Sequence, residues 1–456
     1  MPSLASCGRC LVRGRVKARR APSAPLGRVA ARVGRAPLRL PGIAELNAGL
    51  APDVRRNFRA TLIHWLLAGV FVGSVGSYMA VVVRRIGGDE FTVALAVAVQ
   101  FIGGILAIAG PYLLRGFRPE RAVAALWTIG RLVLVAALFI DEAGPFLVML
   151  LAWSIIAMMG VPIYVGVTQS AFPRRVRGRL IGAAQAAMAV VVLLVSPLAG
   201  GLMDAVGYGP VFAGGAVAGA LGALALLRIR ARPRAPTVRP PPWRMFRQTL
   251  ANRRFRSYTA SSNVALFGDL LIQPTIAVVL VDTFDASFTI VGVLALIQSV
   301  TWAAGYLLWG AVSDRRSGPF VVWMSNLLKL AVAALFILAI QADSLWLLVP
   351  AYAAIGLNFA AGDVGWQTSL ASLARPEDVD AFATSFWVIL GILGIAGPLV
   401  GAAVLVAGGP VAAFAAALGL AGVGSVLMAR VAHGFQPADE LPREAAVSAE
   451  DSRLAH

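Results

Sequence analysis

The chain has 456 residues, of which 14% are charged and 59% hydrophobic, and its formal net charge is +18. Soluble domains carry about a quarter charged residues and somewhat under half apolar ones. With a mean hydropathy of +0.78, this chain cannot cover itself with polar groups, so its solvent must be partly lipid. The positive charge does not indicate nucleic-acid binding, because the arginines stand between long apolar runs and not in a basic patch interleaved with aromatic residues.

Residues 1–55 form a basic segment with few acidic residues and without the apolar core of a secretory signal peptide. We expect this segment to be an irregular, arginine-rich cytoplasmic tail. It holds the two cysteines of the chain, Cys7 and Cys10. Their C-x-x-C spacing has no second pair to complete a metal or redox motif, so we expect no metal site.

Apolar runs of about 20 residues, the length that crosses a bilayer as a helix, fill most of the remaining chain. They lie at 60–83, 91–113, 122–140, 146–169, 180–203, 211–228, 258–281, 290–313, 320–340, 346–369, 381–404 and 410–430. Residues 229–257, between the sixth and seventh runs, hold nine arginines and three consecutive prolines, which is typical of a solvated linker. The sequence therefore predicts an all-α integral membrane protein with twelve transmembrane helices, in two six-helix bundles at 56–228 and 258–430, followed by a cytoplasmic tail at 431–456.

The arginines predict how the chain lies in the membrane. They gather in alternate connections, such as Arg115 to Arg121 and the linker, whereas the intervening connections hold acidic residues such as Asp141 and Asp282. Because positively charged loops stay in the cytoplasm, both termini and the linker are expected there. We expect a bacterial inner membrane protein that acts as a monomer.

An internal repeat relates the two predicted bundles. The hexapeptide Val-Ala-Ala-Leu-Phe-Ile occurs at 135–140 and again at 332–337. Five further short matches, before and after the hexapeptide, occur in the same order in both halves, with separations between 194 and 201 residues. Each half holds an even number of predicted helices, so both halves have the same membrane orientation. Parallel repeats of this kind relate the halves of one large class of transporters.

A loop between the eighth and ninth predicted helices carries a recognisable motif. Gly310, Asp314, Arg315 and Gly318 follow the pattern Gly-x-x-x-Asp-Arg-x-x-Gly with one residue added, which resembles the most recognisable motif of the major facilitator superfamily. The resemblance covers residues 55–430 and implies that the first, fourth, seventh and tenth helices line a central cavity. The Asp-Arg pair is then expected to hold the halves together at the cytoplasmic side in one access state. The alternative is that these residues are ordinary loop charges without a gating role.

Ionisable groups inside the predicted helices are candidates for the site, because a charge at mid-membrane needs a partner or a cavity. Asp269 is the leading candidate for proton coupling or cation recognition, and an ion pair that serves packing alone is the alternative. Arg131 and Lys329 occupy nearly corresponding places in the third and ninth helices, where they are either scaffold residues or partners of a cavity acid. The other polar or aromatic cavity candidates are Asp363, Gln273, Asn263, Tyr78, Trp153, Tyr164, Gln298, Trp302 and Asn358.

Two Pro-x-x-Gly elements are expected to bend helices or pack them closely. They are Pro197 with Gly200 in the fifth helix and Pro398 with Gly401 in the eleventh.

The chain carries no phosphate-binding loop, no metal-ligand motif and no pair of nucleophile and base, so neither ATP-driven pumping nor catalysis is predicted. We expect a secondary transporter that works by alternating access, without a cofactor and driven by an ion gradient, and that exports an amphipathic or drug-like compound with protons. Its partners would be the lipid bilayer and a small solute. Uptake of a sugar or another small polar solute is the alternative, and a transport-inactive membrane sensor or assembly protein is an alternative of a different class.

Overall fold

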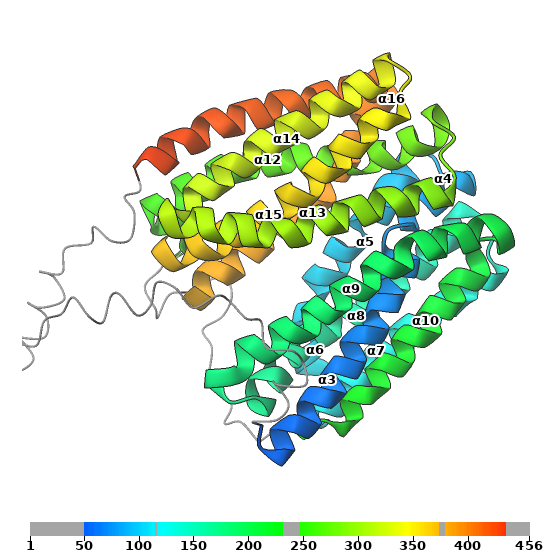
Figure 1. The fold of residues 1–456 in the computed structure, drawn as a ribbon, viewed down its shortest axis with the longest axis vertical. Coiled ribbons are helices and arrows are strands. Elements are labelled where there is room, and N and C mark those ends of the chain that lie inside the picture. Colours follow the sequence, from blue (N-terminus) through cyan, green and yellow to red (C-terminus); the bar gives the residue numbers. More distant parts are fainter. Residues whose placement is uncertain (1–49, 115, 231–246, 248, 374–378, 435–456) are drawn as a thin grey trace, which may run out of the picture. The chain divides into compact units, whose positions relative to one another are not determined.

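The computed structural model describes residues 50–114, 116–230, 247, 249–373 and 379–434. The predicted N-terminal tail up to residue 49, with both cysteines, most of the linker, and residues 435–456 lie outside this part of the chain. The described residues are helical and include no strand. Ten helices in this part are long and apolar enough to cross a membrane, so the chain is an all-helical, multi-pass membrane protein (Figure 1).

The first helix begins with a proline and contains a wide turn. α3 (Pro52–Phe71) carries Pro52 in its first turn, where the missing N–H costs no hydrogen bond. It continues through the π-helical segment η1 (Val72–Gly76) into α4 (Met79–Arg85). The Oγ atom of Ser74, within η1, donates to the Val70 carbonyl at 2.7 Å. The other helices of the first half are α5 (Glu90–Leu106), η2 (Ala107–Ala109), α6 (Gly110–Leu113), α7 (Pro119–Val133), η3 (Leu134–Phe139), α8 (Ala143–Ala171), α9 (Arg174–Val206), α10 (Tyr208–Ala225) and η4 (Leu226–Arg228).

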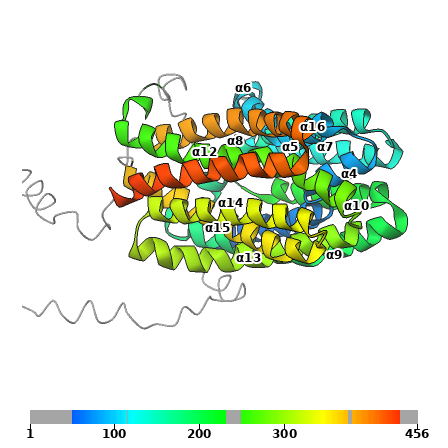
Figure 2. The same cartoon turned by 90° about the horizontal axis from the view of Figure 1, so that it is seen from above.

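The second half begins with a capped helix and ends with a long, interrupted one. Asn252 caps α12 (Arg253–Val278) by accepting hydrogen bonds from two backbone N–H groups. Gly409 interrupts α16 (Val379–His433) with φ 77°, a conformation that favours glycine, and divides it into arms at 379–408 and 410–433. The other helices of this half are η5 (Val279–Thr283), α13 (Phe288–Arg315), α14 (Gly318–Gln341), η6 (Leu345–Leu347) and α15 (Leu348–Leu373). Figure 2 shows α12 lying beside both arms of α16, with which it packs.

The expected count of twelve crossings depends on two elements. α5 is apolar but has only 17 residues, and both arms of α16 must cross separately, which the Gly409 turn allows. Among the described residues, ten helices are long enough to span the membrane. A topology with twelve crossings belongs to the proposed function.

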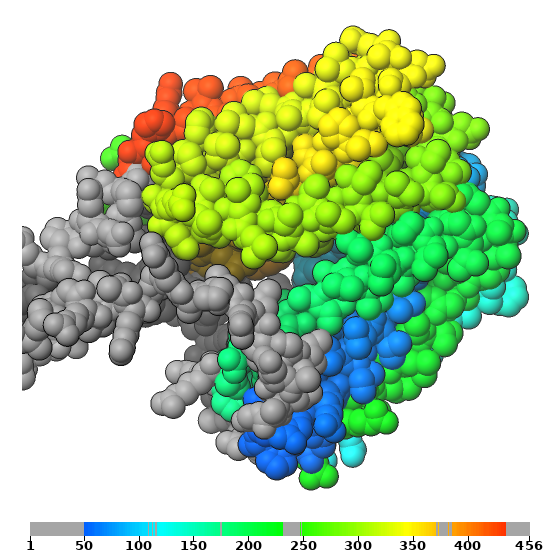
Figure 3. All heavy atoms as spheres, in the orientation of Figure 1, coloured from blue at the N-terminus to red at the C-terminus, as the bar shows by residue number. Residues whose placement is uncertain are grey.

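The most extensive contacts between the two halves are made by two pairs of helices. α9 packs against α13, and α5 packs against α16; Figure 3 shows the atoms of α9 and α13 in contact. Small residues permit this approach, because a Cβ at Gly200 would overlap the Phe288 carbonyl, and one at Gly292 would lie 2.5 Å from the Tyr78 hydroxyl. Within the second half, a Cβ at Gly401 would overlap the Leu271 carbonyl. Both glycines of the Pro-x-x-Gly elements therefore serve close packing, while Pro197 and Pro398 lie inside continuous helix.

Candidate solute cavity between the two halves

A cavity of about 480 Å³ is lined by residues of both halves of the chain. This volume is in the range of pockets that hold small organic molecules, about 300–1,000 Å³. The first half contributes α3, η1, α4, α5 and α8, and the second half contributes α12, η5, α13, α14 and α15. Four of these helices, α3, α8, α12 and α15, correspond to the first, fourth, seventh and tenth predicted runs.

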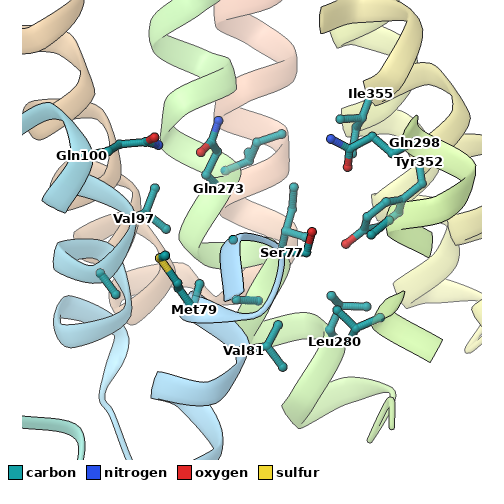
Figure 4. Close-up of a pocket in the computed structure, with 18 of the residues that line it drawn as sticks. Ser77, Met79, Val81, Val97, Gln100, Gln273, Leu280, Gln298, Tyr352 and Ile355 are labelled. Atoms are coloured by element: carbon teal, nitrogen blue, oxygen red, sulfur yellow. The ribbon is translucent and has the colours of Figure 1, made fainter. Parts of the chain in front are cut away.

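Three glutamine side chains mark the polar part of the cavity wall. Gln100 comes from α5, Gln273 from α12 and Gln298 from α13. Figure 4 shows the three carboxamides directed toward a common space, with Ser77 and Tyr352 also on the wall. Each carboxamide offers two N–H donors and an acceptor oxygen, so the wall can bind either donors or acceptors of a solute.

The remaining wall is apolar except for one acid. Phe71, Trp153 and Phe359 contribute aromatic rings, and Asp269 is the one ionisable carboxylate among the described lining residues. Asp269 lies on α12 one turn before Gln273, so both side chains occupy the same face of the helix. The arrangement suits a solute with a flat or apolar body and one polar or cationic group.

Asp269 interacts electrostatically with Lys329 of α14. The Lys329 ammonium donates to Ser325 Oγ at 3.0 Å and to Asn326 Oδ1 at 3.2 Å, both on its own helix. Within the described part of the chain, no ion pair or hydrogen bond joins the ammonium directly to Asp269. Asp269 thus faces the cavity with a cation nearby that is held by other groups.

Four of the ten predicted cavity residues line the cavity, namely Asp269, Gln273, Trp153 and Gln298. Gln100 and Tyr352 also line the cavity. Ser77 and Phe359 were not anticipated from the sequence. Phe359 follows Ile355 by one turn on the same face of α15, a spacing that could have identified it.

Tyr78, predicted in the cavity, is instead fully buried at the contact between α9 and α13. Its hydroxyl donates to the Ser196 carbonyl, and its ring lies edge-on to Phe288 at 6.1 Å. The π-helical turns of η1, which precede it, change the register of the helix, so that Ser77 lines the cavity in its place.

Five other candidates also lie off the cavity wall, and four of them contact a neighbouring helix. Tyr164 accepts a hydrogen bond from Trp65 Nε1 at 3.0 Å, and Asn358 Oδ1 accepts one from Ser325 at 2.7 Å. Trp302 packs its ring against Phe359 at 5.8 Å. The two remaining candidates are Asp363, which accepts a hydrogen bond from the Tyr306 hydroxyl at 2.6 Å, and Asn263, whose Oδ1 is buried without a partner in the described part of the chain.

The predicted cytoplasmic latch is not closed in this structure. Asp314 and Arg315 are exposed at the end of α13, and no ion pair at this end joins the described residues of the two halves. Gly318 begins α14 where a Cβ would overlap Ser369 of α15, whereas Gly310 has open space around it. The motif therefore shapes the α13–α14 turn here without joining the halves.

The halves are instead joined at the opposite end of α13, roughly 40 Å away at 1.5 Å per residue. Arg84 at the end of α4 donates from Nε to both carboxylate oxygens of Asp282 at 3.0 Å. The Asp204 carboxylate, on α9, accepts hydrogen bonds from the N–H groups of Phe288 and Thr289 at 2.9 and 2.8 Å, and from Thr289 Oγ1 at 2.7 Å. We call these residues of the two halves, Arg84, Asp204, Asp282 and Thr289, the charge clamp.

Further contacts support the charge clamp. The Arg85 guanidinium lies 4.2 Å from the centre of the Phe288 ring and donates to the Ala286 carbonyl. Arg84 also pairs with Glu90 at 3.2 Å. Nearby, Asp89 caps α5, and hydrogen bonds from Thr92 hold the pKa of the Asp89 carboxyl below its usual range. The closed end of the cavity is therefore the end that carries acidic connections.

The sequence profile of the Major Facilitator Superfamily matches residues 258–454. A search of curated proteins found no match. Among solved structures, a variant of the nucleoside transporter NupG is similar over 84% of this chain and 100% of its own, with a TM-score of 0.66 and 16% identity. A bacterial homologue of the human lysosomal transporter Spinster, in an inward-facing and unoccupied conformation, is similar over 84% of this chain and 96% of its own, with a TM-score of 0.61 and 16% identity. At this identity the likeness concerns the fold, and it extends through both halves.

Proposed function

We propose that this chain, which belongs to the major facilitator superfamily, is a secondary transporter that moves a small amphipathic solute across the membrane by alternating access. Transport takes place through the cavity between the two halves, with Asp269 as the group that binds a proton or the cationic part of the solute. The preferred direction is export coupled to protons. The protein acts as a monomer with twelve crossings in a bacterial plasma membrane, with both termini in the cytoplasm.

The observation that carries the proposal is one carboxylate on a wall of apolar, carboxamide and hydroxyl groups shared by both halves. A charge in such surroundings is costly unless it is paired or neutralised. Binding of a proton or of a cationic group at Asp269 removes that cost. Because both halves form the wall, their relative movement exposes the bound solute first to one side and then to the other.

The charge clamp supports an access state that is closed at one end. Arg84 with Asp282 and Asp204 with Thr289 join the halves there, while Asp314 and Arg315 at the other end are exposed. With the termini in the cytoplasm, the closed end is the external one, so the cavity opens inward. Export then begins from this state, with the solute entering from the cytoplasm or the inner leaflet.

A second candidate function is the transport of a neutral polar solute, of which a nucleoside is one example. Gln100, Gln273 and Gln298 favour it, because three carboxamides can form paired hydrogen bonds with a nucleobase or with sugar hydroxyls. The similar fold of a nucleoside transporter agrees with this candidate. In this case Asp269 couples the proton and does not contact a cation.

Flux into proteoliposomes tests the proposal with two labelled probes, tetraphenylphosphonium as an amphipathic cation and uridine as a neutral polar solute. We expect cation flux that falls at least tenfold in Asp269→Asn and persists in the control Asp363→Asn, whose acid lies off the cavity wall. Uridine flux without cation flux would support the second candidate. No flux of either probe or of a wider panel would refute both and favour a membrane sensor or assembly protein.

A further inference from the structure

A buried arginine lies one side chain behind the first-half wall of the cavity. Arg131, on α7, is 9% exposed and does not itself line the cavity. Its guanidinium carbon lies 5.2 Å from the centre of the Phe71 ring, over the face of that ring. Phe71, at the end of α3, does line the cavity. A single aromatic side chain therefore connects the guanidinium to the cavity wall.

Three helices of the first half hold this guanidinium in place. Arg131 Nη1 donates to the Gly219 carbonyl of α10 at 2.5 Å, and the guanidinium lies 5.6 Å from the centre of the Trp127 ring on its own helix. Gly219 makes room for the arginine stem, because a Cβ there would lie 2.8 Å from Arg131 Cδ. With Phe71 of α3 as the third contact, the positive charge has a fixed position in the bundle.

The partners of Arg131 stabilise its charge without cancelling it. Among the residues that the structure describes, no ion pair includes Arg131. Its contacts are the faces of two aromatic rings and one carbonyl oxygen. Aromatic faces attract a cation through their quadrupole and carry no net charge. The first-half wall of the cavity is therefore backed by a net positive charge.

The second-half wall has the opposite sign. Asp269 on α12 is the one carboxylate among the described lining residues. In the first half, the rings of Phe71 and Trp153, both on the cavity wall, lie 5.9 Å apart. A cationic group bound at Asp269 neutralises the acid, so any second cationic group in the cavity meets the field of Arg131 alone.

We propose that Arg131 is a specificity-determining residue that excludes a second positive charge from the cavity. This inference rests on the proposed function and specifies its solute more narrowly. The solute carries one cationic group, which binds at Asp269, and an uncharged flat body, which packs against Phe71 and Trp153. Arg131 acts through the Phe71 ring and does not contact the solute.

The position of Arg131 sets the size of the effect. A cationic ring stacked at about 4 Å on the other face of Phe71 would stand roughly 9 Å from the guanidinium, which lies 5.2 Å from the ring centre. At the effective dielectric constant of about 20 that suits protein sites, two unit charges at this distance change an equilibrium constant roughly ten- to twentyfold. Because Arg131 is buried, salt screens the repulsion only weakly.

Two flat probes of nearly equal size test the inference through their dissociation constants for the purified full chain. N-methyl-4-phenylpyridinium carries one positive charge, and N,N′-dimethyl-4,4′-bipyridinium carries two. The unaltered protein should bind the monocation at least about tenfold more tightly than the dication. Arg131→Gln, which keeps a polar group and removes the charge, should reduce this preference to less than about threefold by tightening the binding of the dication.

Arg131→Lys is the matched control, because it keeps the charge and loses the planar guanidinium. It should retain the preference for the monocation. If Arg131 served packing alone, both substitutions would weaken the two probes alike and leave the preference unchanged. An unchanged preference in Arg131→Gln, or an equal loss of it in Arg131→Lys, would overturn the inference.

The fold of each variant is checked by its melting temperature, and Arg131→Met replaces Arg131→Gln if the latter does not fold, with the same expectation. Equal affinity of the unaltered protein for the two probes overturns the inference whichever variants fold. The preference should also persist in high salt, because the repelling charge is buried.

Asp269→Asn separates the inference from the proposed function. It is expected to weaken the binding of both probes at least about tenfold. Equal binding of both probes that is lost in Asp269→Asn overturns the role of Arg131 and leaves Asp269 as the transport site. Absence of cation binding together with flux of uridine overturns the inference and supports transport of a neutral solute. Absence of both activities overturns the proposed function and the inference together.

Discussion

Asp204→Ala should open the closed end of the cavity. The carboxylate accepts two backbone N–H groups and one hydroxyl at the start of α13, so it acts as an N-terminal cap supplied by the other half. Loss of such a cap costs about 1 kcal/mol, and the attraction of a carboxylate to a helix N-terminus adds about 0.3–1 kcal/mol. Because Asp204 is exposed, solvent screens the attraction between its charge and the helix N-terminus. We therefore expect Asp204→Ala to destabilise the closed end by about 1 kcal/mol in all.

A change of about 1 kcal/mol shifts the equilibrium between access states roughly fivefold, since about 1.4 kcal/mol corresponds to a factor of ten. Ser77 lines the cavity, so a Ser77→Cys variant reports on access when Cys7 and Cys10 are replaced by serine. A membrane-impermeant maleimide added to whole cells should label this cysteine about fivefold faster in the Asp204→Ala background. Thr289→Val, which keeps both backbone hydrogen bonds, should have a smaller effect.

Asp314→Ala is the control for the labelling experiment, because Asp314 is exposed at the other end of α13 and forms no described ion pair between the halves. It should leave the labelling rate from outside unchanged. Equal labelling rates in Asp204→Ala and the unaltered background would refute the reasoning that this carboxylate holds the halves together. A faster rate in Asp314→Ala alone would mean that the closed end has been assigned to the wrong side of the membrane.

Three other outcomes are expected. In the same labelling assay, the effects of Arg84→Ala and Asp282→Ala should differ from additivity by less than about 1 kcal/mol, because exposed ion pairs are weak. This coupling energy should fall in high salt. Full additivity of the two substitutions would argue against the ion pair. Gly292→Val should weaken the contact between α9 and α13, because its Cβ would lie 2.5 Å from the Tyr78 hydroxyl; unaltered labelling would show that the helices can separate without cost. The depressed pKa of Asp89 means that its cap stabilises the fold above the unfolded pKa and is lost as pH falls through the folded value, so Asp89→Ala should lower the melting temperature at neutral pH and have no effect in strong acid.

The transmembrane helices were accessible from the sequence because length and hydropathy alone define them. The repeat also identified the relation between the halves, and Gly409 with Pro410 marks a turn of the kind that Gly207 makes before α10. The number of membrane crossings is harder to predict, because α5 is short and a turn at one glycine separates the arms of α16. Hydropathy measures apolar length and does not show where one helix ends and the next begins.

The cavity was only partly predictable, because hydropathy does not say which way a side chain faces. Asp269 and Gln273 share one helix face, so the expectation for one extends to the other. Tyr78 was misplaced because a π-helical segment changes the register before it, and no sequence pattern announces that change with certainty. Arg131 and Lys329 looked nearly equivalent by position, and only the structure showed that Arg131 faces aromatic rings whereas Lys329 is hydrogen-bonded to Ser325 and Asn326 of its own helix.

Solute-dependent proton movement in sealed proteoliposomes tests the central claim most directly. With a pH-sensitive dye trapped inside, addition of tetraphenylphosphonium should change the internal pH when the unaltered protein is present. Asp269→Asn, which keeps the size of the side chain and removes its charge, should abolish that change while Asp363→Asn retains it. Proton movement of equal size in Asp269→Asn, or cation transport without any proton movement, would contradict the account of a proton-coupled transporter that works through Asp269.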